Sequence, residues 1–287
     1  MEFNIVNPKT KSELLRAIRK ETTFRFGAGC TDLLMELKKK PVENLVVINL
    51  SFVVDSRFTG LKKLAKSFWL GAMTTAHTMV MNEQIKNDFN VLYESAHNLA
   101  STQIRQVATM GGNLCTASPS GDIACALMAL DASCHLLNDA GVNSVVNIHD
   151  FFLGVRKTIL KKNEVLYGLT IPTNKKQTKT VYSKFIKIGT RRSMECSVVS
   201  LAYHIQVNEE GVIIGAGIAI GASAPTVRSA LSASGFLIGK NIHLITEKEK
   251  EELACKIVSY AEPITDLRAT AWYRKEVLLN ISKSIFE

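Results

Sequence analysis

The chain lacks the features of a membrane-embedded, secreted or zinc-binding protein. No apolar stretch approaches the roughly 18 consecutive residues that a membrane-spanning helix needs, so we expect no membrane span. The first residues show no basic segment followed by an apolar core, which argues against a signal peptide and favours the cytoplasm. The histidines are scattered without a pair four residues apart, so no zinc site is expected.

The cysteines also lack any pattern that would point to a metal. The chain has six, without C-x-x-C spacing: Cys30, Cys115, Cys125, Cys134, Cys196 and Cys255. In a cytosolic protein such thiols are expected to be reduced and buried. Because an iron–sulfur cluster normally needs a compact set of cysteines, we expect no cluster on this chain.

Length and composition describe an ordinary globular protein. The 287 residues are enough for two domains, and 46% of them are apolar against 21% charged. The net charge is +9, but the basic residues form only short clusters, such as residues 38–40, without aromatic residues between them. A nucleic-acid-binding face would concentrate its charge. We therefore expect no nucleic acid, and attribute the charge to a solvated surface or to weak attraction for anionic partners.

The residue pattern predicts an α/β unit at the start of the chain. Helices are predicted at residues 11–20 and 32–39, and strands at 23–26 and 45–50. Further strands are predicted at residues 68–72, 134–137, 145–148 and 165–171, and helices at 91–100 and 123–131. The glycine-containing segment at residues 26–33 joins a strand to a helix N-terminus, an arrangement typical of phosphate-binding loops.

The C-terminal part has a different order of elements. A polar segment at residues 173–179 is the predicted linker, followed by strands at 181–188, 198–207 and 212–220 and helices at 247–261 and 271–285. Strands followed by helices favour an α+β domain with a sheet covered by helices on one side. We predict one domain at residues 1–175, with subdomains of about 1–55 and 56–175, and a second domain at 176–287.

Two glycine segments carry the functional signal: residues 26–33, and residues 109–114 running on to Asp122. Glycine lets a backbone approach a diphosphate closely and point successive N–H groups at it. A pair of such segments suggests a ligand with a pyrophosphate in its middle. The first segment does not fit the G-x-G-x-x-G spacing, and it could instead be a tight strand-to-helix connection. Asp122 could hold sugar hydroxyls, cap the next helix, or do both.

The motifs themselves resemble a known family. The chain carries AG-x-TDLL at residues 28–34, QIR-x-VAT-x-GGN at 103–113 and ASP-x-x-D at 117–122. It continues with EVL and IP between residues 164 and 172, Lys187 followed by GTRR, and GASAPTVR at 221–228. In this order, over nearly the whole chain, they resemble the FAD-binding middle subunit of the xanthine dehydrogenase family of molybdenum hydroxylases.

The resemblance implies a fold and a set of cofactor-binding residues. The fold would be α+β: an FAD-binding domain of the p-cresol methylhydroxylase/vanillyl-alcohol oxidase type, then a C-terminal α+β domain of the carbon monoxide dehydrogenase flavoprotein type. A first wall would wrap the pyrophosphate, with Thr31 donating its hydroxyl; it consists of Phe26, Gly27, Ala28, Gly29, Cys30, Thr31, Asp32 and Leu33. The second wall and the remaining contacts would come from Thr109, Gly111, Gly112, Asn113, Asp122, Leu166 and Lys187.

The last three of these residues have more specific implied roles. By the resemblance, Asp122 would hold sugar hydroxyls and Leu166 would pack near the flavin ring. Lys187 would lie at the polar edge of the ring and raise its potential, although an exposed strand lysine is the alternative. Arg191 and Arg192 could steer an anionic acceptor or face an acidic partner.

The resemblance also implies an activity. Electrons would pass from a molybdenum site through 2Fe–2S clusters to FAD, and then to NAD+ or another acceptor. The iron–sulfur and molybdenum-cofactor subunits would be separate chains, because this chain lacks the cysteines for clusters. The alternatives are a stand-alone FAD oxidoreductase with its own substrate pocket, and a non-enzymatic module whose glycine segments are structural.

One residue departs from the family pattern. Where relatives carry a second glycine in the first segment, this chain has Cys30. If that position needs a positive φ angle, the Cβ atom costs about 1 kcal/mol. We expect a modest loss of FAD affinity at most, and a redox role of the thiol is the alternative.

Overall fold

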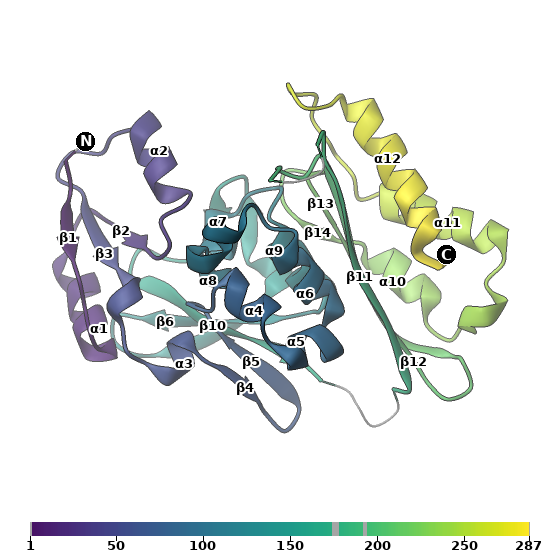
Figure 1. The fold of residues 1–287 in the computed structure, drawn as a ribbon, viewed down its shortest axis with the longest axis horizontal. Coiled ribbons are helices and arrows are strands. Elements are labelled where there is room, and N and C mark those ends of the chain that lie inside the picture. The colour runs from purple at the N-terminus through teal and green to yellow at the C-terminus, as the bar shows by residue number, and fades with distance from the viewer. Residues whose placement is uncertain (1, 174–177, 192–193, 287) are drawn as a thin grey trace.

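The computed structural model describes residues 2–173, 178–191 and 194–286. Its strands form a three-stranded, a five-stranded and a four-stranded sheet, and a small two-stranded sheet (Figure 1). Most of the linker predicted at residues 173–179 lies outside the described residues, as does Arg192. The mixed architecture confirms the predicted α+β class.

The first sheet is parallel, and helices connect its strands. Its order is β1 (Asn4–Val6), β3 (Val46–Asn49) and β2 (Phe24–Gly27), with α1 (Lys11–Lys20) and α2 (Leu33–Lys39) as the connections. Helix α1 begins where the Thr10 hydroxyl accepts a hydrogen bond from the Glu13 N–H (3.2 Å), which satisfies one of the free donors at a helix start. The α/β unit predicted for the start of the chain is therefore present.

The second sheet is antiparallel and lies at the centre of the molecule. Its order is β4 (Leu61–Lys63), β5 (Ser67–Gly71), β10 (Glu164–Pro172), β6 (Ser133–Asn138) and β7 (Asn143–Asn147). The elements around it are η1 (Leu50–Phe52), α3 (Ser56–Thr59), α4 (Ala76–Val80), α5 (Glu83–Asp88), α6 (Asn90–His97), α7 (Thr102–Val107), α8 (Met110–Thr116), α9 (Asp122–Ala129), η2 (Ile148–Asp150), β8 (Phe152–Gly154) and β9 (Lys157–Thr158). Every residue of α9 is buried, so this helix belongs to the core.

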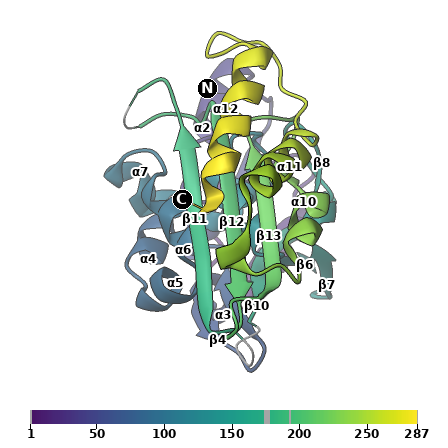
Figure 2. The same ribbon diagram turned by 90° about the vertical axis from the view of Figure 1, so that its right-hand side faces the viewer.

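The C-terminal sheet is antiparallel, in the order β11 (Thr180–Ile188), β12 (Val199–Val207), β13 (Ile213–Gly221) and β14 (Arg228–Ser229). It is followed by α10 (Leu231–Leu237), η3 (Ile242–Leu244), α11 (Glu247–Val258), α12 (Ala271–Lys283) and η4 (Ser284–Phe286). Figure 2 shows α10, α11 and α12 on the outer face of this sheet. The inner face packs against α9 so closely that a Cβ atom at Gly217 would lie 1.9 Å from the Ala129 carbonyl oxygen. The sheet is thus covered on both faces, so the prediction of cover on one side was wrong: the domain's own helices cover the outer face, and α9 of the preceding domain covers the inner one.

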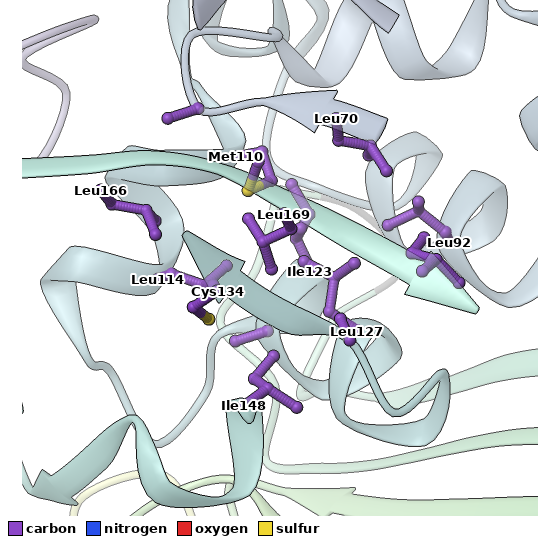
Figure 3. Close-up of a cluster of buried hydrophobic side chains, with 14 of the residues drawn as sticks. Leu70, Leu92, Met110, Leu114, Ile123, Leu127, Cys134, Ile148, Leu166 and Leu169 are labelled. Carbon is purple, nitrogen blue, oxygen red and sulfur yellow. The ribbon is translucent and has the colours of Figure 1, made fainter. Parts of the chain in front are cut away.

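One hydrophobic core joins these layers. Figure 3 shows its centre, where Ile123 and Leu127 of α9 lie near Leu169 of β10. The same cluster continues into the C-terminal sheet through Phe185 and Ala202, so apolar packing contributes to the seam between the sheets. Among the described residues, no helix has the length and apolar character needed to span a bilayer.

Candidate functional site

The first glycine segment presents backbone donors. Strand β2 ends at Gly27, and the chain turns through residues 28–32 before α2 begins at Leu33. From Gly29 to Leu33, no backbone N–H donates a hydrogen bond to another residue that the structure describes. Most of this segment is partly exposed. Free N–H groups at the start of a helix carry partial positive charge, so this turn can bind an anion.

Close packing places this turn against the end of α7, just before the second glycine segment. A Cβ atom on Gly29 would lie 1.9 Å from the carbonyl oxygen of Val107, so only glycine fits there. Arg156 provides a second link. Its side chain forms an ion pair with Asp32, and its backbone N–H donates a hydrogen bond to the Ala117 carbonyl (3.0 Å). The structure therefore brings the two segments together, as the predicted pyrophosphate site requires.

Cys30 has the backbone conformation that glycine favours. Its φ angle is 56°, in the left-handed region. Its thiol donates a long hydrogen bond of 3.4 Å to the Ala28 carbonyl, and burial raises the pKa of the thiol. A raised pKa disfavours the reactive thiolate. Cys30 therefore has the positive φ angle at which a Cβ atom is strained, as considered from the sequence. The raised pKa of its thiol removes support from the alternative of a redox role.

The second segment is not the loop that the sequence predicted, because residues 110–116 form α8. Thr109 is the N-cap: its hydroxyl accepts a hydrogen bond from the Gly112 N–H (3.0 Å), and its carbonyl accepts one from the Asn113 N–H (3.0 Å). The Gly111 N–H donates to the Ala72 carbonyl (2.8 Å). These three N–H groups already have partners within the protein, and that this segment forms the second wall of a pyrophosphate site stays a prediction.

Packing within the protein explains the small residues and the amide of this segment. A Cβ atom on Gly111 would lie 2.8 Å from the carbonyl oxygen of Ala72. The Asn113 side-chain oxygen accepts a hydrogen bond from the Ala124 N–H (3.1 Å), which fastens α8 to the start of α9. The second segment is thus a rigid wall beside the first turn.

A buried ion pair lies at the N-terminus of α9. The Lys187 ammonium on β11 donates to an Asp122 carboxylate oxygen at 2.6 Å and to the Asn98 carbonyl at 3.1 Å. The Ser197 hydroxyl donates to the other Asp122 oxygen, also at 2.6 Å. The exposed fractions of the Asp122 and Lys187 side chains are 3% and 13%. The alternative of an exposed strand lysine was therefore wrong.

These contacts revise the role expected of Asp122. Both carboxylate oxygens bind groups of the protein, and Asp122 is the first residue of α9 and does not cap it, so the N-cap alternative was wrong. That Asp122 also holds sugar hydroxyls stays a prediction. Burial raises the pKa of the carboxyl, while the Lys187 ammonium and the Ser197 hydroxyl act in the opposite direction. No sequence pattern marked Ser197, since a lone serine before a strand carries no signal.

The other predicted site residues differ in their burial and in their contacts. Leu166 is 2% exposed and belongs to the buried cluster of Figure 3, so its contacts are with the protein core. Phe26 packs edge to face against Phe24, with ring centroids 5.2 Å apart, and Thr31 is exposed. The Arg191 side chain donates to the Met194 carbonyl (2.5 Å), within its own loop.

A separate pocket of about 280 Å³ lies at the seam between the sheets. Met128, Phe152 and Leu231 line it, and none of the predicted site residues does. Arg228, at its edge, is already paired with Glu262 at 2.9 Å. The pocket offers no charged group without a partner among its described lining residues, so the glycine segments remain the candidate site.

Comparison with known proteins gives the class and then the family. Residues 1–174 match the model described as FAD binding domain in molybdopterin dehydrogenase. Residues 184–287 match the CO dehydrogenase flavoprotein C-terminal domain. The fold and the site thus define a flavoprotein subunit of an oxidoreductase. The chain belongs to the molybdopterin dehydrogenase FAD-binding family, and its cofactor is FAD.

Individual relatives agree over the full length. The glyceraldehyde dehydrogenase medium chain of Sulfolobus acidocaldarius is 25% identical, over 100% of this chain and 98% of the relative. The nicotinate dehydrogenase FAD-subunit of Eubacterium barkeri is also 25% identical, over 99% and 95%. Carbon monoxide dehydrogenase from Hydrogenophaga pseudoflava shares the fold, with a TM-score of 0.89 at 23% identity over 99% and 96% of the two chains.

The residues present fit such a cofactor. A pyrophosphate is a doubly anionic group, and the turn at residues 29–33 offers backbone donors without other partners among the described residues. The close approach at Gly29 keeps these donors against the end of α7. The turn is therefore chemically suited to an anion such as a pyrophosphate.

Proposed function

We propose that this chain is the FAD-binding electron-transfer subunit of a molybdenum hydroxylase complex of the xanthine dehydrogenase type. Electrons reach its FAD from 2Fe–2S clusters on a partner subunit, which receives them from a molybdenum-cofactor subunit. They leave to NAD+ or another acceptor. The family match supports this reading, as do full-length relatives whose names include "medium chain" and "FAD-subunit".

In this proposal, the turn at residues 28–33 binds the pyrophosphate of FAD, and the N-terminal part of α8 forms the facing wall. The free N–H groups from Gly29 to Leu33 are the observation that carries the assignment. Leu166 supports the wall from the core, on the flavin side. Asp122 contributes mainly by holding Lys187, since both of its oxygens already have partners.

The chain's own residues set the electrostatic environment. FAD supplies the capacity to accept and release electrons one or two at a time. Lys187 places a positive charge at the seam, where it favours negative charge on a reduced cofactor. Because Asp122 and Ser197 hold the ammonium in place, its position does not depend on the cofactor. The buried pair also excludes water from this side of the site.

The proposal includes the domain division and the location. The FAD-binding domain comprises residues 1–175, and the C-terminal domain comprises 176–287; the extents of the two family matches support this division. A cytoplasmic location is supported by six free cysteines, because a reducing compartment keeps thiols unpaired.

Reconstitution of the purified full chain tests the cofactor assignment. The chain should bind FAD in a 1:1 ratio, and denaturation should release it as free FAD. The anion site is checked by competition with inorganic pyrophosphate, which should displace FAD. A chain that stays colourless with excess FAD would contradict the proposal and favour the structural interpretation of the glycine segments.

The acceptor needs a separate measurement. If NAD+ is the acceptor, NADH should reduce the bound FAD in the absence of oxygen, because the transfer is reversible. Failure of NADH, with rapid oxidation of the reduced chain by another acceptor, would exclude the nicotinamide part of the proposal. Turnover of a hydroxylase substrate by the isolated chain would contradict the requirement for partner subunits.

A further inference from the structure

Arg274 is a buried arginine that the proposed electron-transfer role does not use. It lies on α12 with 4% of its surface exposed. One terminal nitrogen donates to two backbone carbonyls, that of Val198 at 2.7 Å and that of Ala222 at 2.9 Å. The other donates to Asp266 at 2.7 Å. A guanidinium can serve several acceptors at once because its donors form a rigid, planar fork.

Each of the two carbonyls belongs to a segment that contacts the candidate site. Val198 follows Ser197, whose hydroxyl binds Asp122 at 2.6 Å. Ala222 donates its N–H to the Pro119 carbonyl at 2.7 Å, in the segment that leads into α9. Ala222 also has a φ angle of 56°, a conformation that a non-glycine residue adopts only under constraint. Arg274 therefore joins the two segments that flank the start of α9.

Asp266, the third acceptor of the Arg274 guanidinium, is itself held in place by hydrogen bonds. Asp266 accepts hydrogen bonds from the N–H groups of Arg268 (2.9 Å) and Ala269 (3.2 Å). These bonds, together with Arg274, lower the pKa of its carboxyl. The carboxylate thus stays charged and keeps the guanidinium in one orientation. The Val198 N–H in turn donates to the Ile188 carbonyl at 2.8 Å, next to Lys187 in the chain.

We propose that Arg274 is a positioning residue for the Asp122–Lys187 pair, acting through the backbone of Val198 and Ala222. The inference rests on the proposed function, since it assigns to a helix of the C-terminal domain the placement of a charge in the FAD site. Loss of the fork frees both segments, so that Ser197 no longer directs the Asp122 carboxylate and the Lys187 ammonium shifts with it. A structural arginine would affect only stability.

The test uses the full chain reconstituted with FAD. The variant Arg274→Lys keeps the charge but cannot serve the two carbonyls and Asp266 together. It should weaken FAD binding by about tenfold, the equivalent of one lost or misplaced polar contact, and should also shift the midpoint potential of the bound flavin. The matched control is Arg268→Met, which removes an exposed ion pair of 3.5 Å to the same Asp266 without touching either carbonyl. It should match the wild type in both measurements.

The outcomes separate this inference from the proposed function. An Arg274→Lys chain with a lower melting temperature but unchanged FAD affinity and flavin potential would overturn the inference. If that variant fails to fold, Ser197→Ala is decisive, because it removes only the hydroxyl that binds Asp122. Ser197→Ala should weaken FAD binding and shift the flavin midpoint potential in the direction expected for Arg274→Lys. A variant with the affinity and potential of the wild type would overturn the inference. A wild-type chain that binds no FAD would instead contradict the proposed function.

Discussion

The two glycine segments are linked through Val107 and Arg156 but use their backbones differently. From Gly29 to Leu33, the N–H groups have no acceptor among the described residues, and residues 28–32 form an irregular turn before α2 begins. From Gly111 to Asn113, every N–H has an acceptor within the protein, and the residues are helical. The first segment can therefore bind an anion, while the second supports it.

The difference shows that glycine content alone does not define a phosphate site. Gly29 and Gly111 are both required by close contact with a backbone carbonyl, that of Val107 and that of Ala72. The number of backbone donors left over after such contacts are made decides which segment binds the ligand. Substitutions in the first segment should thus act mainly on FAD binding, and substitutions in the second mainly on stability.

The largest effect is expected for Gly29→Ala. The new Cβ atom would lie 1.9 Å from the Val107 carbonyl oxygen, whereas non-bonded atoms need about 3.5 Å. The first segment must then move away from the end of α7 by more than 1 Å, and such a displacement weakens a binding site by a factor on the order of 100. Titration of the chain with FAD, followed by flavin fluorescence, measures the loss.

The matched control for this experiment is Gly154→Ala. No heavy atom lies within 4 Å of a Cβ atom at that position, so FAD affinity should match that of the wild type. If Gly29→Ala bound FAD as tightly as Gly154→Ala does, the contact between the segments would have no role in the site.

A smaller effect, of a different kind, is expected for Gly111→Ala. Its Cβ atom would meet the carbonyl oxygen of Ala72 at 2.8 Å, and overpacking of this sort costs about 1–3 kcal/mol of unfolding free energy. Thermal unfolding of the chain without FAD should reveal it. FAD affinity of the folded chain should change far less than in Gly29→Ala.

The control here is Gly235→Ala, inside α10, where the Cβ atom meets nothing within 4 Å. Alanine favours a helix by about 0.5–1 kcal/mol over glycine, so this variant should be slightly more stable than the wild type. The division of roles between the segments would fail if Gly111→Ala lost FAD while keeping its melting temperature.

The sequence predicted most of the fold because its signals are local. Strands β11, β12 and β13 lie within two residues of their predicted bounds, since each is rich in β-branched and other apolar residues and polar or glycine residues separate it from its neighbours. Helices α7 and α8 were missed, because hydroxyl, glycine and amide residues are equally typical of turns. The tertiary hydrogen bond from the Gly111 N–H to the Ala72 carbonyl, which supports α8, cannot be foreseen from these residue types.

The sequence marked the residues of the candidate site but not the hydrogen bonds and ion pairs among them, and that these residues hold FAD stays a prediction. The motifs identified the turn before α2, the pair of glycine segments and Lys187. The pairing of Lys187 with Asp122 joins residues 65 positions apart, and Arg156 reaches Asp32 across 124 positions. Contacts at such separations leave no trace in a single sequence, so Ser197, Arg156 and Arg274 could not be found in that way.

The smallest effect is expected at Cys30, where the first segment departs from its relatives. At a φ angle of 56°, any side chain carries a cost of about 1 kcal/mol, and a β-branched one costs more. Glycine removes that cost but adds about 0.5–1 kcal/mol of backbone entropy. Cys30→Gly should therefore change FAD affinity and melting temperature only slightly. FAD affinity should decrease in the order Gly, then Cys and Ala together, then Val. An alanine variant clearly weaker than cysteine would show that the thiol, and not the backbone, matters at this position.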